Sequence, residues 1–449
     1  MRLTAAQLAE ATGGTLLAEG PPGPVVTDTR KLQPGDWFLA LRGDRFDGHD
    51  FLGRAADADC AGVIVDTAPE EWARGLLRVD DTLVALQDCG RWVRRGFTGP
   101  VVGVTGSAGK TTSRVMIAEV LAHLGLVHQN EGNLNNHFGL PMTLLALEPG
   151  AAAMVLEMGM SGPGEIALLQ DIGRPTVRLI TNVSAAHTQG TGGVEGVARC
   201  KQEMFDGAAP GDVLVVNDDD PHVRAMPHPP GVRVLRYGSS PGCDVQLQSI
   251  TVDAATLSTT LRASLPGGPV EAVIPSPGRH IGLSALGAAA VGAALDLPIS
   301  AIAAGLARYR PVGMRMRVER RGGLVVLNDA YNANPASMRG ALETLAALPG
   351  RRIALLGDML ELGDIEAEAH AEVVALAGRL GLDLLGLAGP RMVAQAENVG
   401  ETPVIVARDA AELGPKVAPR LRSGDVVLLK GSRGARMERI LQALPDVEP

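Results

Sequence analysis

The stretch VVGVTGSAGKTT at residues 101–112 decides the fold of the region around it. Its first half is an apolar strand candidate, and its second half is a glycine-containing turn that opens a helix-length segment at Lys110. Backbone N–H groups and the helix N-terminus cradle phosphate groups at such a strand-to-helix turn. The sequence therefore predicts a nucleoside triphosphate site, with Lys110 at the β and γ phosphates and the Thr111 hydroxyl on magnesium.

The loop departs from the strict phosphate-loop pattern G-x-x-x-x-G-K-[ST], because Val104 stands where that pattern has its first glycine. A glycine-containing turn alone is weak evidence for a phosphate site, but GKTT directly after a strand candidate favours one. The residues expected to contact the nucleotide here are Thr105, Gly106, Ser107, Gly109, Lys110, Thr111 and Thr112.

Apolar runs and helix-length stretches alternate along the chain after this loop. The helix that begins at Lys110 is expected to end near Leu124, where Gly125 follows. Buried-strand candidates come next at 151–159, 177–183 and 211–218. Residues 232–275 alternate like antiparallel strands, and a small-residue helix is expected from residue 280. This alternation predicts a mostly parallel sheet with helices on its faces.

A second α/β pattern begins near residue 310, and a third lies before the phosphate loop, in the first 98 residues. Five apolar runs separated by helix-length stretches, typical of a doubly wound domain, are LVVLNDA (324–330), RIALLGDM (352–359), LDLLGLAG (382–389), PVIVA (403–407) and DVVLLKG (425–431). The predicted fold is α/β with three domains. These are a small N-terminal α/β domain at 1–98, a central P-loop domain with a mostly parallel sheet at 99–312, and a C-terminal Rossmann-like doubly wound domain at 313–449.

Composition limits the possible partners. The formal net charge of the 449 residues is −9, whereas nucleic-acid binding needs clustered Lys and Arg, so no nucleic acid is expected. The first residues lack the basic and apolar regions of a signal peptide, and longer apolar runs are broken by Gly, Pro or charge. We therefore expect a cytoplasmic protein without membrane insertion, and a monomer. Four cysteines without a C-x-x-C pair are expected to be reduced structural thiols.

Lysine is rare in this chain, which contains 41 Lys plus Arg residues. The lysines are Lys31, Lys110, Lys201, Lys416 and Lys430. Arginine is evidently the default cation, so each lysine raises the question of whether it does something that arginine cannot do. A compact ammonium can enter a phosphate loop, and a neutral amine can react with carbon dioxide, whereas a guanidinium stays charged and planar.

Several motifs together resemble the Mur ligases. TGSAGKTT is followed by GNLNNHFGLP, EMGMSGPGEI, NVSAAHTQG and a lysine in ARCKQEMF, as in the ATP-binding domain of that family. TDTRKLQPGD and GDRFDGHDF near the start are similar to its uridine-nucleotide domain, and KGSRGARME near the end to its C-terminal signature. NDAYNANPASM and LGDMLELG resemble the branch that adds D-alanyl-D-alanine. The resemblance spans nearly the whole chain in the expected order.

The resemblance implies a catalytic and metal site. It implies that Lys110 and Thr111 bind the triphosphate and a first Mg²⁺, and that Glu157 contributes a carboxylate to the metal site. It also implies that His187 binds a second Mg²⁺. It implies that Lys201 is carbamylated, which would turn a cation into an oxygen ligand for Mg²⁺. Lys110, Lys201 and His187 are thus the expected catalytic residues. From the residues alone, a structural histidine at His187 and an ordinary surface lysine at Lys201 are the favoured interpretations.

The resemblance also implies how the substrates are held. His280, Arg315 and Asp329 would contact the nucleotide, with Arg315 near phosphate and Asp329 near ribose. The incoming dipeptide would meet Tyr331, Asn332 and Asn334, although Asn-Pro at 334–335 is also a helix-start signal and Asp358 is explained as a helix cap. The residues that would hold the uridine nucleotide and muropeptide are Asp28, Thr29, Arg30, Arg45, Asp47, His49, Asn133, Asn135 and Asn136. Asn-rich loops are often only turns.

One segment departs from the family. Many relatives carry Asn residues after the motif GRH that help to hold adenine, whereas Ile281 and Ser284 stand in SPGRHIGLSAL. The adenine pocket is therefore expected to be built differently, with His280 retained. The phosphate chemistry is expected to be unaffected.

The family reaction implied is ATP-dependent amide-bond formation through an acyl phosphate, between UDP-N-acetylmuramoyl-tripeptide and D-alanyl-D-alanine. Ligases of the same architecture that add a diamino acid, or glutamate to folate, are the nearest alternatives, and YNANPASM and LGDMLELG argue against them. A nucleotide-binding scaffold without turnover is the alternative from another class. The residues of the second metal site argue against that one, because a binding module does not need them.

Overall fold

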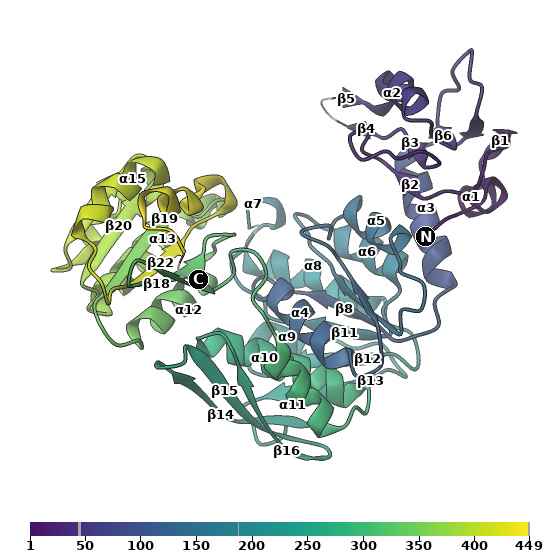
Figure 1. Ribbon diagram of the computed structural model, residues 1–449. Coiled ribbons are helices and arrows are strands. Elements are labelled where there is room, and N and C mark those ends of the chain that lie inside the picture. The colour runs from purple at the N-terminus through teal and green to yellow at the C-terminus, as the bar shows by residue number, and fades with distance from the viewer. Residues whose placement is uncertain (44–45, 187, 448–449) are drawn as a thin grey trace. The chain divides into compact units, whose positions relative to one another are not determined.

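The structure is a computed structural model that describes residues 1–43, 46–186 and 188–447. It divides into two compact units, one of Met1–Gly103, Leu124–Gly159 and Gly164–Thr176, the other of Val104–His123, Met160–Pro163 and Val177–Pro449. Within the described residues, no helix has both the length and the apolar character needed to span a bilayer. The α/β class predicted from the sequence is confirmed (Figure 1).

The N-terminal residues form a five-stranded sheet with the order β1-β7-β6-β3-β2. Its strands are β1 (Thr15–Ala18), β2 (Val25–Val26), β3 (Trp37–Leu39), β6 (Gly62–Val65) and β7 (Gly75–Arg78). Its helices are α1 (Ala5–Thr12), α2 (Leu52–Asp57) and α3 (Thr82–Arg95), with a small hairpin of β4 (Arg42–Gly43) and β5 (Phe46–Asp47). Phe38 and Val63 lie in an apolar core with Cys60, whose thiol is buried.

The second sheet has nine strands in the order β16-β15-β14-β13-β12-β11-β8-β10-β9. The strands are β8 (Val101–Thr105), β9 (Val127–Gln129), β10 (Ala153–Glu157), β11 (Val177–Ile180), β12 (Val213–Asn217), β13 (Arg233–Gly238), β14 (Val245–Asp253), β15 (Ser258–Leu265) and β16 (Gly268–Ile274). The helices in this part are α4 (Lys110–Leu121), α5 (Gly139–Leu145), α6 (Glu165–Gly173), α7 (Thr188–Thr191), α8 (Val194–Asp206), α9 (Pro221–Ala225), α10 (Arg279–Ala294) and α11 (Ile299–Arg308).

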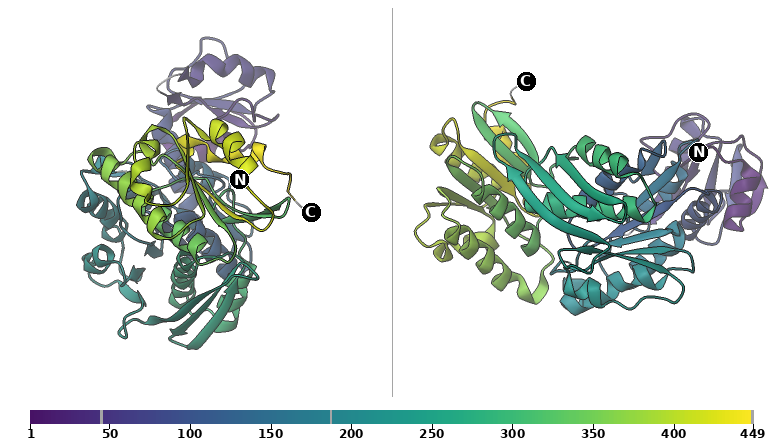
Figure 2. Two further views of the ribbon diagram at one scale, coloured as in Figure 1. Left: turned by 90° about the vertical axis from the view of Figure 1, so that its left-hand side faces the viewer. Right: turned by 90° about the horizontal axis from the view of Figure 1, so that it is seen from below.

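Two expectations for this sheet need correction. Strand β13 pairs in parallel with both β12 and β14, so the antiparallel pattern expected for residues 232–275 holds only for β14, β15 and β16. Figure 1 labels these three strands, and Figure 2 shows the molecule from two further directions. Helix α4 ends at Leu121 rather than near Leu124. Its apolar residues are buried and pack against α10 and α11.

The C-terminal sheet has the order β17-β18-β22-β19-β20-β21. Its strands are β17 (Arg317–Arg321), β18 (Leu324–Asp329), β19 (Arg352–Gly357), β20 (Leu384–Ala388), β21 (Val404–Ala407) and β22 (Val426–Lys430). The helices are α12 (Pro335–Ala346), α13 (Glu366–Arg379), α14 (Pro390–Val393) and α15 (Ala410–Val417), followed by a 3-10 helix at Met437–Ala443. The five predicted strands are confirmed, whereas β17, the antiparallel edge strand, was not predicted from the sequence.

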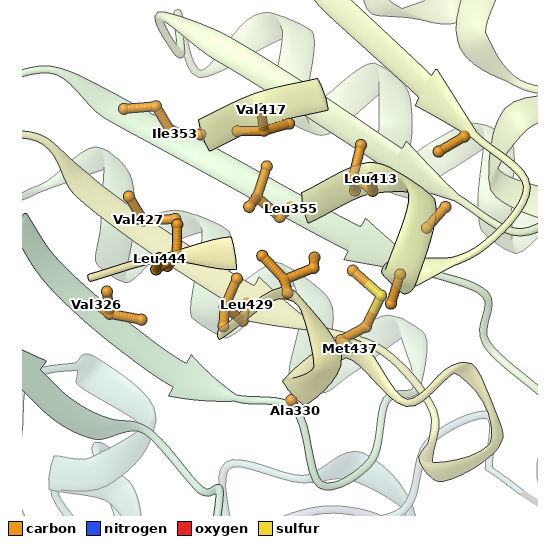
Figure 3. Packing of buried hydrophobic residues seen from close by; sticks show 14 of the residues in the cluster. Val326, Ala330, Ile353, Leu355, Leu413, Val417, Val427, Leu429, Met437 and Leu444 are labelled. Atoms are coloured by element: carbon orange, nitrogen blue, oxygen red, sulfur yellow. The ribbon is translucent and has the colours of Figure 1, made fainter. Parts of the chain in front are cut away.

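One apolar core holds this sheet to the helix α15. Leu413 and Val417 from α15, with Met437 from the 3-10 helix, lie over Ile353 and Leu429 of the strands (Figure 3). Helix α12 contacts β19 and β22 and also α13, so helices pack against the sheet as a doubly wound fold requires. The carboxyl ends of the parallel strands β18 and β22 bring Asp329 and Lys430 into register.

Candidate functional site

The phosphate loop has the backbone expected for anion binding. Gly106 has φ +150°, and a Cβ there would lie 1.8 Å from Thr181 Oγ1, so only glycine fits. Gly109 has φ +79° and is the N-cap of α4, and as a glycine it has no side chain to cap the first turn. The first-turn N–H groups of a helix have no partners within the helix, and the helix dipole is positive there. The N-terminus of α4 therefore suits a phosphate group.

The segment after β11 fixes the shape of this loop. Asn182 accepts hydrogen bonds from the N–H groups of Ser107 and Ala108, both at 3.0 Å. The Ala108 carbonyl accepts from Thr181 Oγ1 at 2.7 Å and from Asn182 Nδ2 at 3.0 Å. Ser107 Oγ donates to the carbonyl of Ser184. Sequence analysis did not assign these roles, although three polar residues directly after a buried strand were a usable signal.

The loop's own side chains face the same region. Lys110 Nζ donates to the Gly106 carbonyl at 2.7 Å, so the ammonium lies over the turn that is expected to hold phosphates. Thr111 and Thr105 are buried. Thr112 forms a hydrogen bond with Tyr309, whose pKa burial raises to about 12. Loop geometry, a buried hydroxyl and a local ammonium together fit a magnesium-bound triphosphate.

Lys201 is buried on helix α8, with 2% of its surface exposed. The alternative interpretation of an ordinary surface lysine is therefore wrong. Burial places the pKa of Lys201 well below its usual value, and the nearby Lys110 lowers it further. Val197, Cys200, Met204 and Phe205 are buried at helical spacing around it. That spacing was a sequence signal for burial that the sequence analysis did not use.

A neutral amine is the form of lysine that this burial favours. It is also the form that can react with carbon dioxide, because the ammonium has no free electron pair. The buried position of Lys201 therefore fits the carbamate that the family resemblance implies. Burial alone does not make the carbamate, because the amine must also react with carbon dioxide.

Glu157 ends strand β10 and lies in the first unit, with 3% of its surface exposed. Asn135 Nδ2 donates to Glu157 Oε1 at 2.8 Å, and the Glu157 N–H donates to Asn130 Oδ1 at 2.6 Å. Two asparagines therefore orient this residue. Asn130 was not predicted as a site residue, while Asn133 and Asn136 take part in turns, with Asn136 accepting from the Gly139 N–H at the start of α5.

Two predicted site residues, His187 and Arg45, lie outside the described residues. Across the described ranges, no group of three or more His, Cys, Asp and Glu side chains is placed to bind a metal ion. Of the metal-site residues implied by the resemblance, Glu157 is the one described residue of these four types. The others are the Thr111 hydroxyl, a carbamate on Lys201, and His187, which lies outside the described residues.

Asp329 and Lys430 meet at the carboxyl end of the C-terminal sheet. Lys430 Nζ donates to Asp329 Oδ2 at 2.5 Å and to the Asn332 carbonyl at 3.1 Å. Asp329 Oδ1 accepts from the Met316 N–H at 3.0 Å. Lys430, to which sequence analysis gave no role, is thus in contact with two of the predicted substrate-binding residues.

The neighbouring predicted residues lie in the same part of the second unit. The Arg315 guanidinium lies over the Tyr331 ring, 3.7 Å from its centroid, a cation–π contact. Asn334 Nδ2 donates to the Ser107 carbonyl of the phosphate loop at 3.2 Å. Burial lowers the pKa of His280, while the nearby Asp329 carboxylate acts in the opposite direction. The structure therefore brings Arg315, Asp329 and His280 together with the loop in one compact unit.

The helix-start interpretation of Asn334 is confirmed, whereas Asp358 is not the cap residue of a described helix. Asn334 is the N-cap of α12 and forms a capping box with Ser337, so it has a structural role in addition to its loop contact. Asp358 Oδ1 accepts from the Met392 N–H in the first turn of α14 at 2.8 Å, although the N-cap residue of α14 is Gly389. Asp358 therefore stays without a catalytic role.

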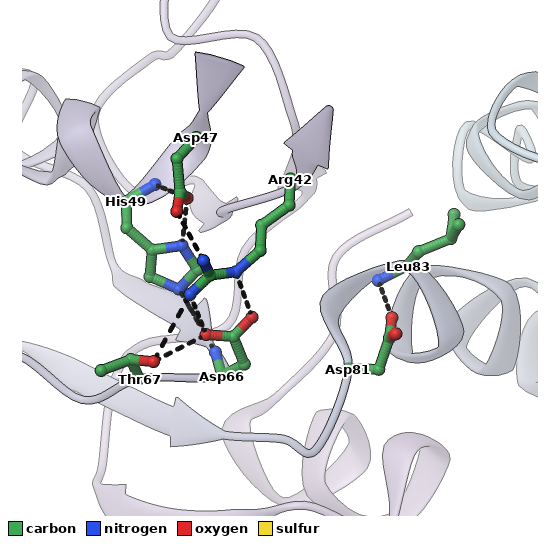
Figure 4. A network of polar contacts seen from close by, with 7 residues as sticks. All are labelled: Arg42, Asp47, His49, Asp66, Thr67, Asp81 and Leu83. Atoms are coloured by element: carbon green, nitrogen blue, oxygen red, sulfur yellow. Dashed lines mark hydrogen bonds and ion pairs between the residues drawn. The ribbon is translucent and has the colours of Figure 1, made fainter. Parts of the chain in front are cut away.

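The N-terminal candidates already have partners within the chain. Arg30 binds Asp28 through two nitrogens and lowers the pKa of that carboxyl to about 2, and Thr29 lies in the same turn. His49 Nδ1 lies 2.6 Å from Asp47 Oδ1 (Figure 4). Arg42 forms ion pairs with both Asp47 and Asp66. Sequence analysis missed Arg42 and Asp66, which lie far apart along the chain.

Comparison with known proteins agrees with this geometry. Residues 104–292 match the Mur ligase middle domain, and residues 314–433 match the Mur ligase, glutamate ligase domain. The UDP-N-acetylmuramoyl-tripeptide–D-alanyl-D-alanine ligase of Escherichia coli K12 is 35% identical over 448 residues, covering 99% of this chain and 98% of that protein. The chain belongs to the Mur ligase family. It is therefore an ATP-dependent amide-bond ligase.

Solved Mur ligases share its fold over nearly their whole length. A crystal structure of MurF from Acinetobacter baumannii has a TM-score of 0.91 at 30% identity and covers 98% of both chains. MurF from Thermotoga maritima in complex with ADP has a TM-score of 0.84 at 29% identity, covering 94% of this chain and 96% of that one. The ADP in this Mur ligase supports the assignment of a nucleotide site to the present chain.

Proposed function

We propose that this Mur ligase joins D-alanyl-D-alanine to UDP-N-acetylmuramoyl-tripeptide and converts ATP to ADP and phosphate. The observation that carries this proposal is the full-length match to the E. coli ligase of that name. The Bacillus subtilis ligase of the same name supports it, being 36% identical over 94% of this chain. The product would be a precursor for peptidoglycan.

The chemistry follows from the poor reactivity of a carboxylate. In the first step a carboxylate oxygen of the muropeptide attacks the γ-phosphorus of ATP, and the bond to the β-phosphate oxygen breaks to release ADP. In the second step the dipeptide amine attacks the acyl phosphate, a tetrahedral intermediate forms, and phosphate leaves with the carboxylate oxygen. The amine loses a proton, and no covalent enzyme nucleophile is needed.

The residues of the phosphate loop would offset the negative charge of the phosphate groups in both steps. Lys110 and the N-terminus of α4 would bind the triphosphate, because both carry positive charge toward the loop. Mg²⁺, when bound, would offset further phosphate charge, held by the Thr111 hydroxyl, Glu157 and His187. A carbamate on Lys201 would add oxygen ligands, forming when the neutral amine bonds to carbon dioxide and a proton is released.

Substrate binding is assigned by domain. The domain at 1–98 would hold the uridine nucleotide, the domain at 99–312 ATP, and the domain at 313–449 the dipeptide and one side of the nucleotide. Support for the third assignment comes from the contacts that group Asp329, Asn332 and Tyr331 with Arg315 and Lys430. A cytoplasmic location and a monomeric state belong to the same proposal.

Measuring phosphate release with reactants omitted one at a time tests the function. Phosphate should appear with UDP-muramoyl-tripeptide, D-alanyl-D-alanine, ATP and Mg²⁺ together, along with a pentapeptide product. Release that depends on a diamino acid, or on glutamate and folate, in place of the dipeptide would replace the proposal with a related ligase. Nucleotide binding without any turnover would support a scaffold instead.

A further inference from the structure

Lys430 occupies a position that the chemistry above does not use. It is the last residue of β22, with 2% of its surface exposed, and it lies in register with Asp329 on β18. Its Nζ donates at 2.5 Å to Asp329 Oδ2 and at 3.1 Å to the Asn332 carbonyl. A buried ammonium therefore contacts one residue assigned to the nucleotide and another assigned to the dipeptide.

The same carboxylate also holds the segment that leads into the C-terminal sheet. Asp329 Oδ1 accepts from the Met316 N–H, and Met316 is buried with φ +53°. A left-handed backbone is unfavourable for a methionine, so this contact maintains a conformation that the chain does not prefer by itself. Arg315, the residue assigned to phosphate, directly precedes Met316.

Ser432 extends this support to the next residue of the loop. Its Oγ donates to the Ala333 carbonyl at 3.3 Å and accepts from the Leu360 N–H at 2.9 Å. Side chains from the end of β22 thus hold the backbone at both Asn332 and Ala333. The loop 331–334 depends on β22 for its position, although the two segments are about a hundred residues apart in sequence.

We propose that Lys430 is a positioning residue that ties the nucleotide subsite at Asp329 to the dipeptide subsite at Asn332. This inference rests on the proposed function. A buried ion pair is weak evidence for stability, because desolvation offsets much of its attraction. Lysine suits the position better than arginine, since one compact ammonium donates to a carboxylate and a carbonyl in different directions, whereas a guanidinium is planar and larger.

The test replaces the ammonium with a side chain of similar length, Lys430→Met. Both contacts are lost, so the KM for ATP and the KM for D-alanyl-D-alanine should each rise about tenfold. Lys416→Met makes the same chemical change on the exposed helix α15, where Lys416 pairs with Glu412, and should leave both constants unchanged. A purely structural role for Lys430 would lower the active fraction, and hence kcat, without changing either KM.

A double-variant cycle with Asp329→Asn separates the two contacts. In the Asp329→Asn background, adding Lys430→Met should no longer change the KM for ATP, but it should still raise the KM for the dipeptide about tenfold. The double variant has no unpaired buried charge, so it carries the test if Lys430→Met alone does not fold.

The outcomes separate this inference from the proposed function. If the wild-type protein forms no pentapeptide, the proposed function fails. If the wild-type protein is active and Lys430→Met, or the double variant compared with Asp329→Asn, shows an unchanged KM for the dipeptide, the positioning role of Lys430 is refuted.

Discussion

Replacement of Gly106 by alanine should damage the phosphate loop far more than glycine replacement elsewhere. The new Cβ would lie 1.8 Å from Thr181 Oγ1, so the Thr181 side chain must leave the Ala108 carbonyl that it now contacts at 2.7 Å. A lost hydrogen bond costs about 1 kcal/mol. Holding alanine at φ +150° adds about 2 kcal/mol of backbone strain. The altered loop must be returned to its phosphate-binding shape when ATP binds. The sum of about 3 kcal/mol therefore corresponds to roughly a 100-fold weaker affinity for ATP.

Isothermal titration with ATP and Mg²⁺ measures this loss directly, alongside a thermal melt of each variant. Gly424→Ala is the matched control, because Gly424 also has a positive φ, +91°, but no atom lies within 4 Å of the added Cβ. The control should lose about 1 kcal/mol of stability and keep its affinity for ATP. A Gly106→Ala protein that is folded and binds ATP as tightly as the wild type would refute the reasoning about the loop.

The remaining predictions concern buried or paired charges. Lys201→Arg should lower ligation about 100-fold or more, because arginine cannot be carbamylated; full activity would remove Lys201 from the mechanism. Lys201→Met should raise the melting temperature at pH 7 in buffer without carbon dioxide, since the lowered pKa of Lys201 means that the unfolded chain binds this proton more tightly than the folded chain does. This gain should shrink as the pH rises toward 10, and a constant gain would contradict the cause given. Asp66→Asn should cost about 1 kcal/mol at pH 6, because Arg42 lowers the pKa of Asp66 to about 2. That contribution is present above pH 4 and lost as the pH falls toward 2, so denaturant unfolding of wild type and variant should converge there.

Local patterns in the sequence were sufficient for much of the fold. The strand, glycine turn and helix at 101–121 are encoded in neighbouring residues, and each of the five apolar runs after residue 320 forms a strand of the C-terminal sheet, although β21 at its edge is partly exposed. The direction of each strand relative to its neighbours in the sheet was harder to predict. Strand β13 is parallel to its neighbours although its sequence alternates, and β17 pairs at an edge with a mostly charged sequence that has no apolar signature.

In the candidate site, too, local motifs could be predicted from the sequence, whereas contacts between distant segments could not. Residues within a motif, such as Lys110 and Asn334, could be named from the sequence because the motif itself implies their surroundings. Contacts between distant segments could not, as Lys430 with Asp329 and Arg42 with Asp66 show. Burial of Lys201 lies between these cases, since helical spacing of its apolar neighbours was visible in the sequence.

The acyl phosphate is the central chemical claim, and the fate of one oxygen atom tests it most directly. The muropeptide would be labelled with oxygen-18 in its terminal carboxylate and incubated with the purified protein, ATP, Mg²⁺ and D-alanyl-D-alanine. Mass spectrometry of the released phosphate should then show one oxygen-18 atom for each pentapeptide formed, because the carboxylate oxygen leaves with the phosphate. Pentapeptide formed together with unlabelled phosphate would contradict an acyl-phosphate route.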